Sequence, residues 1–189
     1  TCACSAGSKT RRTEACRSSR RKANTRMKKF NRTALSRRDF HEAHEFLCAI
    51  QNTSHKATRY ALIVSAIISY ARPFSGNEKD IKAEAERNLH IDPSTILTED
   101  QIILHNEILR LRNKLVAHAE FSESPVRLLD SRPDGMTLHG PYVQANGRYY
   151  DLRDYLLEID TVAFTRIADL FAVHCLNEMY KLKEQEART

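Results

Sequence analysis

The sequence predicts an all-α fold, a four- to five-helix up-and-down bundle that carries a small β-hairpin or meander insertion near residues 126–150. Apolar residues recur at helical spacing in several long segments. Residues 60–71 are apolar on nearly every side, which is typical of the central helix of a bundle. The strongest turn signals, Arg132-Pro133-Asp134-Gly135 and Asn146-Gly147, both occur within the expected insertion.

The first two long helices are predicted from periodicity and from the residues that interrupt it. We expect the first helix over residues 36–50, with Ser36 as its N-cap. A second helix over residues 54–72 should end at Pro73 and Gly76, which do not continue a helix. Residues 78–89 are predicted to form a short, charged helical piece.

The later helices follow similar signals. Thr98 and Gln101 fit a capping box, so we expect a third long helix to begin at Thr98 and to end near residues 118–121. A last helix is expected over residues 152–184. Its predicted buried stripe, which includes His174 as a core histidine, is Leu152, Tyr155, Leu156, Ile159, Val162, Ala163, Ile167, Leu170, Phe171 and His174.

The basic residues are concentrated near the N-terminus. Residues 1–38 contain 13 Lys and Arg and one acid, whereas the remainder contains 17 basic and 23 acidic residues. Residues 1–26 lack periodicity, so we expect residues 1–30 to form a disordered basic tail before a helical domain over 31–189. We favour Met27 as the natural start, and the alternative is a genuine basic arm or targeting segment. With Met27 as the start, bulk charge gives no argument for nucleic-acid binding.

Cysteine usage and hydropathy favour a cytoplasmic protein without a membrane segment. The five cysteines form no C-x-x-C pair, and Cys48 and Cys175 occur singly in helical patterns, as small buried apolar groups do. The longest apolar run is about half of the roughly 20 residues that span a membrane. His41 and His44 share a helix face but lack the H-E-x-x-H pattern, so we expect neither a metal site nor a cofactor.

The most informative motif lies at the end of the third predicted helix. Arg112 is followed by Asn113, and His118 comes six residues after Arg112. Arginine binds phosphate in a bidentate manner, and histidine transfers protons near neutral pH. Six residues of helix give about 9 Å of rise and roughly 120° of rotation, so the two side chains would lie on adjoining faces. We therefore expect a partly unwound helix end or a homodimer that supplies a second copy of the motif.

With this motif the chain resembles the HEPN superfamily, whose signature is an arginine, a polar residue, three to five further residues and a histidine near the end of a bundle helix. The segments 109–118 and 70–74 resemble abortive-infection-type and toxin-like members, and the resemblance extends over about residues 40–183. Some toxin-type members have a regulatory tyrosine two residues after the histidine. Glu120 occupies that position here, so regulation by tyrosine modification is not expected.

The resemblance implies a metal-independent endoribonuclease of bacterial phage defence or toxin–antitoxin stress response. Arg112, Asn113 and His118 would be its catalytic residues, and RNA, a second copy of the chain and a cognate antitoxin its partners. Cleavage by the ribose 2′-hydroxyl would leave a 2′,3′-cyclic phosphate and a 5′-hydroxyl. The alternative is a non-catalytic HEPN-like module that binds RNA or a protein.

Three further cations could extend a phosphate-binding strip. Arg110 and Lys114 flank the motif, and Arg72 lies at the end of the second predicted helix. A purely structural interpretation stays open beside the catalytic one. In it, Arg112 pairs with an acid such as Glu107, and His118 interacts with the negative end of the helix dipole.

Overall fold

The computed structural model describes residues 7–75, 85–86, 88–117, 142–145 and 148–187, and for residues 7–22, 114–117, 142–145 and 148–152 it describes the backbone only. These residues are mostly helical, which confirms the all-α class. The α-helices that they form are α1 (Gly7–Gln51), α2 (Lys56–Ala71), α3 (Glu99–Ala117), α4 (Leu152–Leu157) and α5 (Thr161–Ala187). Two short 3-10 helices are η1 (Arg72–Phe74) and η3 (Pro93–Thr95).

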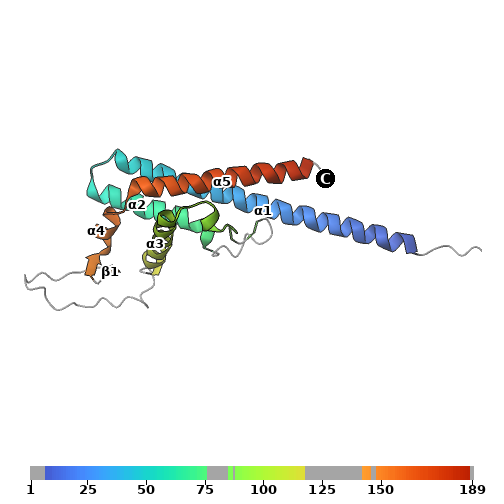
Figure 1. The fold of residues 1–189 in the computed structure, drawn as a ribbon, viewed down its shortest axis with the longest axis horizontal. Coiled ribbons are helices and arrows are strands. Elements are labelled where there is room, and N and C mark those ends of the chain that lie inside the picture. The colour runs from blue at the N-terminus through green and yellow to red at the C-terminus, as the bar shows by residue number, and fades with distance from the viewer. Residues whose placement is uncertain (1–6, 76–84, 87, 118–141, 146–147, 188–189) are drawn as a thin grey trace, which may run out of the picture.

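Helices α1, α2 and α5 lie side by side and form the body of the bundle (Figure 1). Helix α5 runs antiparallel to α1, because Arg26 donates to the carbonyl of Gln185 at 3.1 Å whereas His44, later in α1, contacts Asp169, earlier in α5. Helix α2 returns along α1 and places the Ser69 hydroxyl 2.8 Å from Glu42 Oε2. Helix α3 crosses this layer steeply and packs mainly on α2 (Figure 1).

One apolar core joins the helices of the bundle. Its centre is aromatic: the ring of Tyr70 packs edge-on against Phe40 and Phe164, with centroid separations of 5.5 and 5.2 Å. Burial of large apolar side chains is the main stabilising contribution to such a bundle. The largest fully buried side chains are Tyr70, Phe40, Phe164, Phe171, Leu47, Ile63, Ile67, Ile108, Leu111, Leu156 and Ile167.

Helix α1 begins far before the predicted start at Ser36. It includes most of the segment that we expected to be disordered, because no glycine or proline interrupts the chain between Ser8 and Gln51. Ser36 is buried inside the helix, where its hydroxyl donates to the carbonyl of Arg32 at 2.9 Å. This bond to the preceding turn takes the place of the predicted capping role. Helix α1 extends past the end of α5 (Figure 1).

The predicted last helix is divided in two. Helix α4 ends at Leu157, and Asp160 caps α5 by accepting from the backbone N–H groups of Val162 and Ala163 at 3.0 and 2.9 Å. The break changes the register of the buried stripe, so the prediction that Val162 and Leu170 are buried was wrong: they are 53% and 37% exposed. His174, predicted to be a core histidine, is only half-buried.

Helices α2 and α3 agree closely with their predicted ranges. The backbone N–H of Thr98 donates to Gln101 Oε1 at 3.0 Å, which confirms half of the expected capping box. Of the predicted helical piece over 78–89, residues 78–84 and 87 lie outside the described residues.

The predicted insertion over residues 126–150 lies mostly outside the described residues as well. At its C-terminal end the structure describes two short antiparallel strands, β1 (Tyr142–Ala145) and β2 (Arg148–Asp151), with Val143 opposite Tyr150. This pair alone does not support the larger meander, which stays a prediction.

Candidate functional site

Arg112 and Asn113 lie in the last two turns of α3, as the sequence predicts. Helix α3 is anchored just before them by Ile108 and Leu111, which are fully buried. Arg112 is half-buried and Asn113 is exposed, and the guanidinium Nη1 of Arg112 donates to Asn113 Oδ1 at 3.2 Å. This local bond orients the guanidinium at the helix C-terminus, where the dipole favours a cation.

Two further candidate residues, His118 and Lys114, have no described side chain. His118 follows the last residue of α3 and lies outside the described residues. Lys114 belongs to α3, but the structure describes only its backbone. The convergence of Arg112, Asn113 and His118 on one phosphate therefore stays a prediction.

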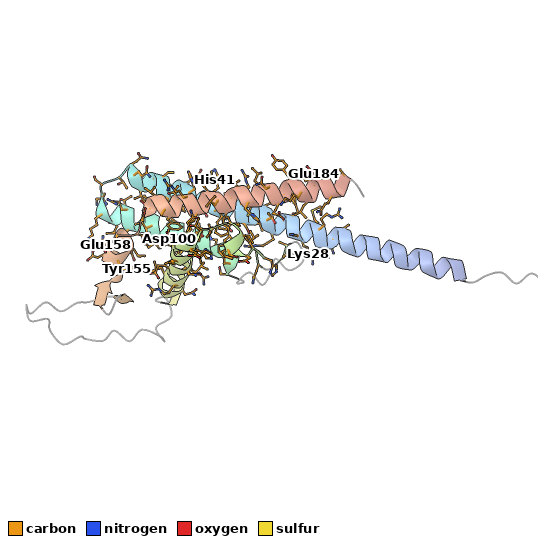
Figure 2. The ribbon with its side chains drawn as sticks, in the orientation of Figure 1. Lys28, His41, Asp100, Tyr155, Glu158 and Glu184 are labelled. Atoms are coloured by element: carbon orange, nitrogen blue, oxygen red, sulfur yellow. The ribbon has the colours of Figure 1, made fainter. Side chains whose placement is uncertain are left out.

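Arg110 is held in an ion pair within the bundle. Its Nε and Nη2 atoms donate to the two carboxylate oxygens of Glu107 at 2.6 and 2.5 Å. The Tyr155 hydroxyl, from α4, donates to the same carboxylate at 2.8 Å, and Figure 2 labels this tyrosine. The bonds to Glu107 raise the pKa of Arg110 above its usual value. Glu107 is thus the partner of Arg110 and forms no ion pair with Arg112 among the described residues.

Arg72, the first residue of η1, is held against α1. Its Nη1 lies 2.7 Å from Glu42 Oε2 and 3.5 Å from Asp39 Oδ1. Burial raises the pKa of Asp39, and the nearby Arg72 guanidinium opposes that effect. Arg72 also borders a surface groove of about 480 Å³ formed mainly by α1 side chains. Arg72 thus pairs with acids of α1, whereas the bond of Arg112 is to Asn113 within α3.

A buried polar pair in the core was missed by the sequence analysis. The Tyr70 hydroxyl and His105 Nδ1 share a hydrogen bond of 2.8 Å between α2 and α3. Burial raises the pKa of Tyr70 well above its usual value and lowers the pKa of His105, so both groups are kept neutral. The apolar positions around His105 could have predicted its burial, but its partner on α2 depends on how the helices cross.

His41 and His44 point to different partners. His41 Nδ1 lies 3.6 Å from Glu45 Oε1, whereas His44 contacts Asp169 of α5 and Cys48 of α1. Among the described residues, no group of three or more His, Cys, Asp or Glu side chains is arranged to hold a metal ion. No helix in the described part of the chain is long and apolar enough to cross a membrane.

Comparison of the chain with protein-family models, with curated proteins and with solved structures finds no match. The assignment to the HEPN superfamily therefore rests on the motif at residues 112–118 and stays a proposal.

Proposed function

We propose that the protein is a metal-independent endoribonuclease whose site is the C-terminal end of α3. The observation that supports this proposal is the state of Arg112. Arg110 and Arg72 are both paired with carboxylates, whereas the only polar partner of Arg112 among the described residues is the neutral amide of Asn113. A guanidinium whose partner in the described part of the chain is neutral is better suited to bind a phosphate than one already paired with a carboxylate.

The proposed reaction uses the nucleophile that RNA itself carries. His118 takes the proton of the ribose 2′-hydroxyl, and the 2′-oxygen attacks phosphorus. The bond from phosphorus to the 5′-oxygen breaks as that oxygen takes a proton from the His118 imidazolium. Arg112 stabilises the negative charge that builds up on the phosphoryl oxygens, and Asn113 holds Arg112 in place. The products are a 2′,3′-cyclic phosphate and a 5′-hydroxyl.

The spacing of the motif favours a homodimer for this reaction. Residues six apart on a helix are separated by about 9 Å along the axis and by roughly 120° around it. A two-fold axis near the end of α3 would let His118 of one copy act beside Arg112 of the other. A place in bacterial phage defence or in a toxin–antitoxin pair, with a cognate antitoxin in the cytoplasm, follows from the HEPN resemblance and is part of the proposal.

The test is cleavage of a mixed-sequence RNA in the presence of EDTA. The wild-type chain is compared with Arg112→Ala and His118→Ala, and with Arg166→Ala and His90→Ala as matched controls on exposed side chains. Loss of a transition-state contact to a charged group lowers the rate by about 100-fold or more. We expect that loss in the first two variants, unchanged rates in the controls, and cyclic phosphate ends on the products.

Two outcomes would overturn the enzymatic proposal. One is cleavage that persists in both Arg112→Ala and His118→Ala, or that EDTA abolishes. The other is RNA that the wild-type chain binds without cutting, which would favour the non-catalytic binding module.

A further inference from the structure

Cys48, His44 and Asp169 form a continuous chain of hydrogen bonds on the surface between α1 and α5. His44 Nδ1 lies 2.5 Å from Asp169 Oδ1, and His44 Nε2 lies 3.2 Å from the Sγ of Cys48. His44 and Cys48 are one turn apart on α1, so their side chains meet, and Asp169 approaches from the antiparallel α5. A nucleophile, a base and an acid that orients the base are thereby connected in order.

The positions of the protons in these two hydrogen bonds follow from which atoms can only accept. An ionised carboxylate only accepts hydrogen bonds, so Nδ1 of His44 donates to Asp169. In the neutral ring the other nitrogen, Nε2, is then an acceptor, and the Cys48 thiol donates to it. Transfer of that thiol proton to Nε2 gives a thiolate beside an imidazolium, whose charge Asp169 stabilises.

The second cysteine with a described side chain has a very different environment. Cys175 is fully buried on α5, and burial raises the pKa of its thiol to about 12. Cys48 is only half-buried, and the two residues behind it are open to solvent, with 33% of the His44 side chain and 52% of the Asp169 side chain exposed. Because Cys48 is itself not buried, a small reagent dissolved in water can reach its thiol.

We propose that Cys48 is a reactive thiol, activated by His44 and Asp169, whose substrate is a small peroxide such as hydrogen peroxide. The Cys48 thiolate attacks one peroxide oxygen, an S–O bond forms and the O–O bond breaks. Sulfur is oxidised to sulfenic acid and the peroxide is reduced by two electrons. The departing hydroxide takes the proton from the His44 imidazolium and leaves as water, which restores the neutral ring.

The surroundings favour this substrate over an acyl group. Acyl transfer needs hydrogen-bond donors that stabilise an oxyanion near the nucleophile. Cys48 and Asp169 lie inside helices, where neighbouring backbone N–H groups bond to carbonyls four residues earlier. A peroxide needs only the thiolate and a proton donor, and both are supplied here. This inference is independent of RNA cleavage, because it involves neither Arg112 nor His118.

The experiment measures sulfenic acid at each cysteine of the full chain. The protein is treated with hydrogen peroxide at pH 7, trapped with a dimedone-type probe, and analysed by peptide mass spectrometry as a function of time. The variants are His44→Gln and Asp169→Asn. His41→Gln is the matched control. His41, which Figure 2 labels, lies one turn before His44 on α1 and pairs with Glu45.

The thiolate is the nucleophile, and a thiol without a neighbouring base must lose its proton to solvent before it can react. We therefore expect the rate at Cys48 to fall about tenfold in His44→Gln, and severalfold in Asp169→Asn. It should be unchanged in His41→Gln and far above the rate at Cys175. Equal rates at Cys48 in His44→Gln and the wild type would overturn the proposal. A fall in His41→Gln as large as the fall in His44→Gln would do the same. Circular dichroism establishes that each variant is folded, and alkylation by iodoacetamide should follow the same order.

Discussion

The hydrogen bond between Tyr70 and His105 provides a sharp test of the core, because each partner can be removed with little change in shape. Tyr70→Phe keeps the aromatic ring and its edge-on contacts with Phe40, Phe164 and Phe171. It removes only the hydroxyl, which lies 2.8 Å from His105 Nδ1. His105→Leu removes the other partner and fills most of the same space. The double variant removes both polar groups together.

The expected magnitude follows from burial. Both residues are buried, so either single substitution leaves one polar group without a partner inside the core. Such a group costs roughly 1–3 kcal/mol, whereas removal of both partners can be nearly neutral. We expect each single variant to lose about 2 kcal/mol of unfolding free energy, which for a chain of this size lowers Tm by about 4–8 °C. The double variant should lose clearly less than the sum of the two.

Urea unfolding at pH 8, where His105 is neutral in both states, measures these free energies. The coupling is the difference between the loss in the double variant and the sum of the two single losses, and we expect it to exceed about 1 kcal/mol. If the two single effects add within about 0.5 kcal/mol, the hydrogen bond contributes no coupling and the reasoning from burial is refuted.

Three further predictions concern pH, a buried acid and a helix cap. Burial lowers the pKa of His105 in the folded protein, so as pH falls the unfolded chain binds the proton first. The free energy of unfolding should therefore decrease as pH falls below about 6.5. In urea titrations, His105→Leu should lack that part of the pH dependence. Arg72→Met removes the nearest cation of the buried Asp39 and leaves the more exposed Arg38 paired with it, at 3.8 Å. Since Arg72 is itself 45% exposed, we expect a loss of about 1 kcal/mol that added Asp39→Asn largely restores, as measured by thermal unfolding. Asp160→Ala removes the N-cap of α5 and should cost about 1 kcal/mol in the same assay, whereas Asp160→Ser should retain most of the stability.

The sequence predicts the elements whose ends carry strong local signals. Helix α3 begins where Thr98 and Gln101 form their capping contact, and helix α2 ends just before Pro73. The start of α1 could not be predicted in the same way, because Ser36 is compatible with both a cap and a helix interior. Its bond to the carbonyl of Arg32 is made only once the preceding turn is helical. The opposite happens at Asp160. It caps α5, but the apolar periodicity continues on both sides of it, so the sequence predicts one uninterrupted helix there.

The candidate functional residues also differ in whether local sequence signals can predict them. The motif places Arg112 and Asn113 at a helix end from sequence spacing alone, and the structure agrees. The chain of hydrogen bonds through His44 could not be found this way, because Asp169 is 125 positions away from it in the sequence. The spacing of His44 and Cys48 was visible, but only the antiparallel packing of α5 on α1 supplies the acid.

Residue type alone also does not show which cation is free to bind a substrate. Arg72, Arg110 and Arg112 are equally suited to phosphate as isolated side chains. Packing separates them, because α1 supplies Glu42 to Arg72 and α3 supplies Glu107 to Arg110. A phosphate would have to displace those carboxylates, whereas the one polar partner of Arg112 within the described residues is the neutral amide of Asn113. If the chain binds RNA as proposed, that binding should depend on Arg112 far more than on the other two arginines.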